Sequence, residues 1–124
     1  MKPFSDSPAR EEPPVDVERL REFTSGNPEQ LRELVAIYLA QANELIESLD
    51  LAIQAGSAKE VENLAHKFCG SSSTCGMTAI VPLLHELELS GRAGQLSDAR
   101  QLQAQARKQL DHIQCFLADY LRSV

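Results

Sequence analysis

Residues 65–77 read Ala65-His66-Lys67-Phe68-Cys69-Gly70-Ser71-Ser72-Ser73-Thr74-Cys75-Gly76-Met77. The apolar residues in and just before this stretch follow a helix, because at about 100° per residue they fall within about 40° of one line. This expected core face comprises Val61, Leu64, Ala65, Phe68, Ser72 and Cys75. His66 lies about 140° from that line, on the solvent side. Gly70, one turn further on, has no side chain that could cover the His66 imidazole. The stretch therefore predicts an exposed imidazole that another macromolecule can approach.

The composition of the chain is that of a single all-α domain. Its 124 residues are 43% hydrophobic and 24% charged, which is ordinary for one globular domain. Four of the six prolines lie in the first fourteen positions, and the alternation typical of strands is absent. We therefore expect a disordered, Pro-rich tail over residues 1–14 and a helical domain over residues 15–124.

Start signals are clear for the first two helices of this domain. Asp16 is the expected N-cap of a short helix. The inward side chains of that helix would be Val17, Leu20 and Phe23. Asn27-Pro28-Glu29 combines an N-cap, a proline at the first helical position and an acid in the first turn. It predicts a long helix that ends at Gly56. Its apolar stripe comprises Leu31, Leu34, Val35, Tyr38, Ala42, Leu45, Ile46, Leu49 and Ile53.

Three further helices follow. Ser57, with Glu60 three residues later, predicts a capping box at the start of the helix that carries His66. Gly76 is expected to end that helix or to mark a short break. The next helix is expected over residues 78–90, followed by a turn over residues 91–94. The last helix starts at Ser97 or Asp98. Four substantial amphipathic helices with short connections predict an antiparallel four-helix bundle, with a short additional N-terminal helix.

Charge and cysteine content exclude several classes of function. A net charge of -6 argues against binding to nucleic acid or to an anionic membrane surface. The sequence contains no apolar run of membrane-spanning length and no apolar segment of a secretory signal, so we expect a cytoplasmic protein. The three cysteines suit reduced thiols. On one continuous helix Cys69 and Cys75 would be about 9 Å apart, too far for a disulfide.

The residues at helical spacing around His66 are small, polar and mixed in charge. They are Lys59, Glu62, Asn63, Cys69, Gly70 and Ser73. A neutral imidazole is nucleophilic at neutral pH, and this surround would admit a phosphoryl group. It holds no cluster of acids or bases able to run hydrolysis. We therefore interpret the site as one of docking and transfer.

Other interpretations of individual residues are weaker. The ligand types of a zinc site occur in His66, Cys69, Cys75 and His85, but the spacing fits no short zinc motif and Cys75 points to the core. Cys69 is either a redox-sensitive thiol or, as we favour, an ordinary half-buried cysteine. Glu88 is expected to be solvated or to pair helices. Ser71, Ser72 and Ser73 are expected to allow close helix approach, and His85 and His112 to be surface or boundary residues.

The pattern Ala65-His66-x-Phe68-x-Gly70-Ser71-Ser72-x-x-x-Gly76 resembles the signature of the histidine-containing phosphotransfer (HPt) domain of two-component phosphorelays. Leu87-Glu88 and Arg92-Ala93-Gly94 are similar to the ending of that family's next helix, and the resemblance covers about residues 17 to 122. It implies that His66 Nε2 accepts a phosphoryl group from an aspartate of one receiver domain and passes it to another. It also implies that Gly70 leaves room for the receiver's loops.

The resemblance further implies the partners and the cofactors. The partners would be receiver domains of hybrid sensor kinases and response regulators, and the chain would be a monomer. It would need no metal or cofactor of its own, because the receiver supplies the Mg²⁺. Without an ATP-binding module, the chain would be a phosphocarrier and not an autonomous kinase.

One position departs from the family pattern. The lysine that usually stands three residues after the histidine is Cys69 here. Lys67, about 100° round the helix, and Lys59, two turns earlier, are candidates to offset the charge of the phosphoryl group in its place. The departure supports an alternative function, a binding module that docks receiver domains without phosphotransfer. A helical adaptor with no receiver contact is a third possibility.

Overall fold

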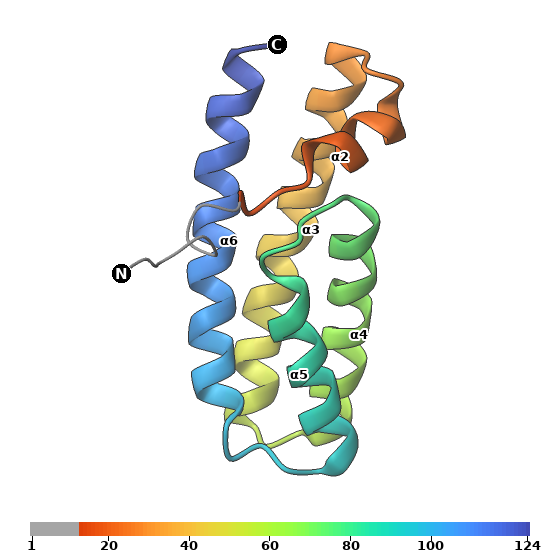
Figure 1. Cartoon of the computed structure of the whole chain (residues 1–124). Helices are drawn as coiled ribbons and strands as arrows, with labels where there is room; N and C mark the ends of the chain where they lie inside the picture. Colours follow the sequence, from red (N-terminus) through yellow and green to blue (C-terminus); the bar gives the residue numbers. More distant parts are fainter. Residues whose placement is uncertain (1–12) are drawn as a thin grey trace, which may run out of the picture.

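The computed structural model describes residues 13–124, which form helices and turns with no strand. The helices are α2 (Val17–Thr24), α3 (Pro28–Gln54), α4 (Ala58–Thr74), α5 (Val81–Ala93) and α6 (Ala99–Arg122). The last four run side by side with reversals between them, while α2 lies across one end of the bundle (Figure 1). The predicted antiparallel four-helix bundle with an additional N-terminal helix is confirmed. None of the described helices is both long enough and apolar enough to cross a membrane.

Most of the tail expected over residues 1–14 lies outside the described residues. Of its last two residues, Pro13 is exposed, whereas Pro14 is partly buried and its carbonyl oxygen accepts a hydrogen bond from the Ala79 amide, N to O 3.2 Å. The next residue, Val15, is fully buried. The chain is therefore tied to the loop between α4 and α5 just before α2 begins.

The helix starts test the capping predictions directly. The Asp16 side chain accepts a hydrogen bond from the Arg19 amide at 3.3 Å, and Asn27 Oδ1 accepts two, from the amides of Glu29 and Gln30. Both predicted N-caps are confirmed. Ser57 also precedes its helix, but its side chain makes no capping hydrogen bond, so the predicted capping box is wrong. The helix is held instead by the packing of its apolar face.

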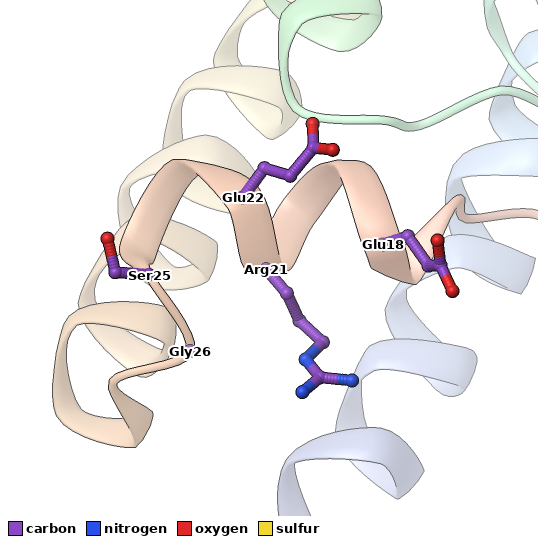
Figure 2. A pocket seen from close by; sticks show the side chains of 5 residues that line it. All are labelled: Glu18, Arg21, Glu22, Ser25 and Gly26. Carbon is purple, nitrogen blue, oxygen red and sulfur yellow. The ribbon is translucent and has the colours of Figure 1, made fainter.

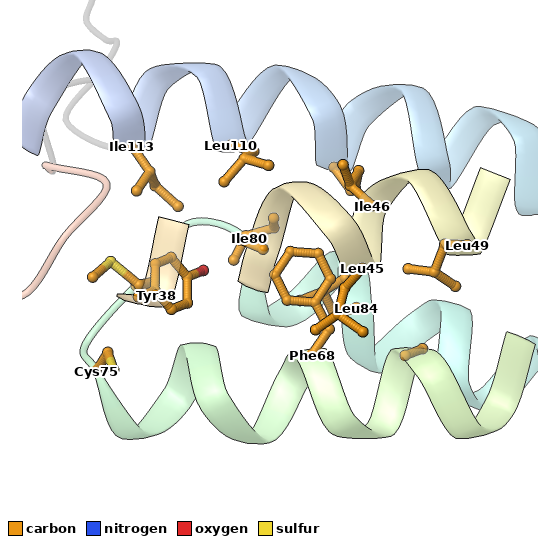
Figure 3. Packing of buried hydrophobic residues seen from close by; sticks show 14 of the residues in the cluster. Tyr38, Leu45, Ile46, Leu49, Phe68, Cys75, Ile80, Leu84, Leu110 and Ile113 are labelled. Atoms are coloured by element: carbon orange, nitrogen blue, oxygen red, sulfur yellow. The ribbon is translucent and has the colours of Figure 1, made fainter. Parts of the chain in front are cut away.

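Phe68 occupies the centre of the core (Figure 3). It is fully buried, and around it pack aliphatic side chains from the other bundle helices: Leu45, Ile46, Leu49, Leu84, Leu110 and Ile113. The predicted core face of α4 is confirmed, although Leu64 is only partly buried. Ser72 lies in this face as a polar residue, and its hydroxyl is 2.8 Å from the Tyr38 hydroxyl. That hydrogen bond satisfies both groups inside an apolar core.

Two helix predictions need correction. The sequence predicts that Phe23 faces inward, but its side chain is 55% exposed and Thr24 is buried in its place. A helix of only two turns docks across the bundle end, so its buried face is set by that docking and not by the bundle periodicity. The helix expected over residues 78–90 instead begins at Val81 and continues to Ala93. Its last residues include Gly91, for which the sequence predicts a turn, and Gly94 ends the helix with a positive φ of 70°.

Gly76 fixes α2 against the end of α4. Its φ of 81° suits glycine, and a Cβ there would lie 2.7 Å from the carbonyl oxygen of Asp16. At the same point the Asp16 amide donates to the Gly76 carbonyl, and Arg19 Nε donates to the Thr74 carbonyl at 3.4 Å. No larger residue could accept both the backbone conformation and the contact.

Candidate functional site

His66 lies near the middle of α4, on the face turned away from the core. Its side chain is 76% exposed, as the helical phase predicted. One ring nitrogen is nevertheless held, because Nδ1 lies 2.9 Å from Oε2 of Glu88 on α5. The carboxylate of Glu88 is itself only 9% exposed. The imidazole is thus anchored through Nδ1 while the rest of the ring faces solvent.

This contact determines which nitrogen carries the proton. An ionised carboxylate only accepts hydrogen bonds, so a hydrogen bond to Glu88 requires a hydrogen on Nδ1 of His66. In the neutral imidazole the other nitrogen, Nε2, then has its lone pair free. The geometry leaves a nucleophilic nitrogen on the exposed part of the ring.

Arg92 and Glu62 extend the contact into a series of interactions that returns to α4. Arg92 donates from Nη2 to Oε2 of Glu88 at 2.9 Å and from Nε to Oε2 of Glu62 at 3.2 Å. Glu62 lies one turn before His66 on α4, and Glu88 lies one turn before Arg92 on α5. We call these four residues the α4–α5 network. Lys59 adds a cation at its edge, with Nζ 3.5 Å from Oε1 of Glu62.

The network is balanced in charge only when Lys59 at its edge is counted. The two carboxylates then face two cations, the Arg92 guanidinium and the Lys59 ammonium. The hydrogen bond from Arg92 is the main reason that the pKa of Glu62 lies below its usual value, against a smaller opposing effect of desolvation. Lys59 lowers that pKa further. The cations Arg92 and Lys59 are therefore both paired with carboxylates.

Gly91 brings the two helices close enough for this network. A Cβ at Gly91 would lie 2.5 Å from the Glu62 amide nitrogen and 2.7 Å from the Ala58 carbonyl oxygen. These are backbone atoms of α4, which cannot move aside cheaply. Only glycine therefore lets α5 approach α4 at this level, and the side chains of Glu88 and Arg92 then reach across the contact.

The remaining predicted site residues surround His66 on the open side. Asn63, Lys67, Gly70 and Ser73 are exposed. A Cβ at Gly70 would meet no atom within 4 Å, so the space beside this residue is open. The surface beside the imidazole is therefore exposed, with open space at Gly70.

Cys69 is half-buried between α4 and α5, as we favoured. Its Sγ lies 3.9 Å from the Val81 carbonyl oxygen. Burial raises the pKa of the thiol, and the negative charge of Glu88 raises it further. Cys69 is therefore a protonated, neutral group at the position where the family pattern has a cation.

Within residues 13–124, no group of three or more His, Cys, Asp or Glu side chains is placed to bind a metal ion. Cys75 is buried, His85 is exposed on α5, and Cys69 and Cys75 are free thiols. A polar hollow of about 300 Å³ lies elsewhere, along α2 (Figure 2). It is lined by Glu18, Arg21, Glu22, Ser25 and Gly26, and includes no predicted site residue.

Two site residues were missed as such from the sequence. Glu88, expected to be solvated or helix-pairing, is buried and pairs α4 with α5. For Arg92, the sequence indicates only a similarity to the family pattern and no contact with the site. Their spacing of four residues, with the acid first, is a sequence signal for an ion pair along one helix face. It does not reveal that this face meets His66.

Two comparisons with known proteins indicate the family of the chain. The model of the Hpt domain family matches residues 33–115. The chain belongs to the Hpt domain family. A similar solved structure is the crystal structure of histidine-containing phosphotransfer protein B (HptB) from Pseudomonas aeruginosa PAO1. It is 26% identical with a TM-score of 0.84, and the match covers 90% of this chain and 97% of HptB. No curated protein sequence matches the chain. The family predicted from the sequence is confirmed, and with it histidine phosphotransfer as the class of function of this Hpt protein.

Proposed function

We propose that this Hpt protein carries a phosphoryl group on Nε2 of His66 and passes it between aspartates of receiver domains, one on a sensor kinase and one on a response regulator. The observation that supports this most strongly is the 2.9 Å contact between His66 Nδ1 and Glu88 Oε2. It directs the lone pair of the imidazole to the exposed nitrogen. The clearance at Gly70 gives a partner's active site access to that nitrogen.

The transfer needs no proton movement on the Hpt side. The lone pair of Nε2 attacks the phosphorus of a receiver phosphoaspartate, an N–P bond forms, and the P–O bond breaks with its electrons returning to the aspartate carboxylate. The ring becomes an imidazolium that keeps its proton on Nδ1. Glu88 faces that proton with a negative charge and so stabilises the phosphorylated ring.

The same contact assists onward transfer. When the aspartate of a second receiver attacks the phosphorus, the N–P bond breaks and its electrons return to Nε2. The leaving group is a neutral imidazole with its proton still on Nδ1. A ring held protonated at Nδ1 is a better leaving group than a deprotonated one, so Glu88 serves acceptance and donation alike. The Mg²⁺ and the remaining charge stabilisation belong to the receiver.

The proposal is tested by transfer from a receiver labelled with a radioactive small phosphodonor. We expect acid-labile, base-stable label on the wild-type Hpt protein and none on His66→Gln. His85→Gln is the matched control, because it removes an exposed imidazole from the neighbouring helix and should leave the label unchanged. Label that persists in His66→Gln would refute the assignment. Repeating the assay with every receiver of the source organism would identify the partners.

A second candidate function is receiver docking without phosphotransfer. Cys69 favours it, because no ammonium stands at that position to offset the charge of a phosphoryl group. It predicts that a receiver binds the wild-type protein while no label moves to His66. A plain helical adaptor predicts that His66→Gln changes neither receiver binding nor signalling output.

A further inference from the structure

We infer that Arg92 is a positioning residue for His66, acting through Glu88 to select the imidazole tautomer whose Nε2 is free to react. The inference rests on the proposed function only for its effect on transfer rate. The tautomer itself can be measured in the unphosphorylated protein. The role follows from the geometry of the α4–α5 network.

A single oxygen of Glu88 accepts hydrogen bonds from both His66 and Arg92. Oε2 of Glu88 lies 2.9 Å from Nδ1 of His66 and 2.9 Å from Nη2 of Arg92. A glutamate has three side-chain torsions, so the approach of this oxygen to His66 depends on what else holds it. Arg92 is the group that holds it, at a spacing of one helical turn.

Arg92 is in turn fixed from the opposite helix. Its Nε donates to Oε2 of Glu62, which starts from α4 one turn before His66. The guanidinium is planar and rigid, so two hydrogen bonds to two carboxylates define its orientation. The path from His66 through Glu88 and Arg92 to Glu62 therefore begins and ends on α4. Such a closed path sets the position of the Glu88 oxygen relative to the imidazole.

Arg92 does not contact the reacting atoms. Its described hydrogen bonds go to the two carboxylates, and it reaches the imidazole through Glu88, on the Nδ1 side of the ring. A phosphoryl group on Nε2 would lie on the other side of the ring. The guanidinium accordingly acts on the tautomer and not as a direct ligand of the phosphoryl group.

Removal of Arg92 has a definite chemical consequence. Without Arg92, the Glu88 oxygen is no longer held in place beside Nδ1 of His66. Because the His66 side chain is 76% exposed, its imidazole is then free to turn and to exchange protons with water. A free neutral imidazole side chain favours the tautomer with hydrogen on Nε2. In that form the accessible nitrogen carries a proton in place of a lone pair, and its attack on phosphorus is blocked.

The test reads the tautomer by NMR. Protein labelled with ¹⁵N is examined by long-range ¹H–¹⁵N correlation at a pH where His66 is neutral. We expect Nδ1–H in the wild type, a shift toward Nε2–H in Arg92→Gln, and a smaller shift in Glu62→Gln. Arg92→Lys should restore the wild-type tautomer only in part, because a single ammonium cannot hold both carboxylates in one geometry.

Arg107→Gln is the matched control. Arg107 on α6 pairs with Glu47 on α3 at 2.8 Å, so this variant also loses an arginine–glutamate pair between two helices, but away from His66. Its His66 tautomer should equal that of the wild type. Phosphotransfer to Arg92→Gln should fall roughly tenfold, the size expected for loss of one hydrogen bond to a charged group. Arg107→Gln should transfer normally.

The outcomes separate this inference from the proposed function. A folded Arg92→Gln protein that keeps the wild-type tautomer overturns the inference, even if its phosphotransfer is lost. A shifted tautomer in Arg92→Gln, with no label reaching wild-type His66 from any receiver, upholds the inference and refutes the proposed function. If Arg92→Gln fails to fold by circular dichroism, Arg92→Lys and Glu62→Gln decide the question by the same spectra.

Discussion

Oε2 of Glu88 lies 2.9 Å from Nδ1 of His66, although the two residues are 22 positions apart in the chain. The contact joins a nearly buried carboxylate to an exposed imidazole. It exists because Gly91, one turn further along α5, lets the backbones of α4 and α5 approach. The reactivity proposed for His66 thus depends on the packing of two helices and not on α4 alone.

Glu88→Gln should slow phosphotransfer more than it weakens receiver binding. The amide oxygen can still accept from Nδ1 of His66, but it brings no negative charge to stabilise the imidazolium. Hydrogen bonds to charged groups are worth about 1.5–3 kcal/mol, so we expect a rate about 10- to 100-fold lower. Single-turnover transfer measures this. Glu86→Gln, on the exposed side of the same helix, is the control, and equal rates in the two variants would contradict the role of Glu88.

Gly91→Ala should destabilise the bundle and slow transfer together. The added methyl group would lie within 3 Å of three backbone atoms of α4, so the helices must separate. Such overpacking costs about 1–3 kcal/mol, which urea unfolding would measure as a lower midpoint. An unchanged midpoint would show that α4 and α5 can shift without cost.

Gly70 should behave in the opposite way. A side chain there meets open space inside a helix, so Gly70→Ala should stabilise the protein by up to about 1 kcal/mol. Gly70→Gln should keep this stability but block the approach of a receiver to His66. Urea unfolding and receiver titration, run on the same samples, separate the two effects. Normal receiver binding by Gly70→Gln would place the docking surface elsewhere.

Cys69→Lys should restore the missing cation beside His66. The flexible stem of a lysine can leave the half-buried position and carry its ammonium to the surface. We expect several-fold faster acceptance of the phosphoryl group and a longer-lived phosphohistidine, measured by loss of label over time. Cys69→Ala controls for removal of the thiol alone. If lysine and alanine at this position give the same lifetime, the α4–α5 network makes the cation unnecessary in this Hpt protein.

Tyr38→Phe tests the buried hydrogen bond to Ser72. Loss of the bond should cost about 1 kcal/mol, with more if the Ser72 hydroxyl is left unsatisfied. The variant Tyr38→Phe/Ser72→Ala should therefore be less destabilised than the sum of the single changes, as a double-mutant cycle in urea would show. Additive losses would mean that the two hydroxyls are not coupled in the folded protein.

Tyr38 also makes the stability of the folded protein depend on pH. Burial raises the pKa of Tyr38 above its usual value of 10.0, so the folded state resists its ionisation. The phenol therefore contributes stability that is fully present below the unfolded pKa and is lost as the pH rises. The stability difference between wild type and Tyr38→Phe should narrow between about pH 9 and about pH 11. A difference that stays constant over this range would contradict the raised pKa.

Features that depend on neighbours within about four residues could be predicted from the sequence. The apolar spacing defined the buried face of α4 and hence the exposure of His66. The side chains of Asp16 and Asn27 marked helix starts, because their partners are backbone amides two or three residues away. The residues around His66 also sufficed to indicate the family.

The way in which the helices meet depends on their packing in three dimensions. Gly91, predicted to lie in a turn, is the residue at which α5 approaches the backbone of α4. Phe23 is exposed, and Glu88 is buried with its carboxylate in contact with His66. These outcomes depend on the separation and rotation of elements distant in the chain, which no local spacing encodes. The sequence thus determined that His66 is accessible. The packing of α5 on α4 determines which of its nitrogens is held by Glu88.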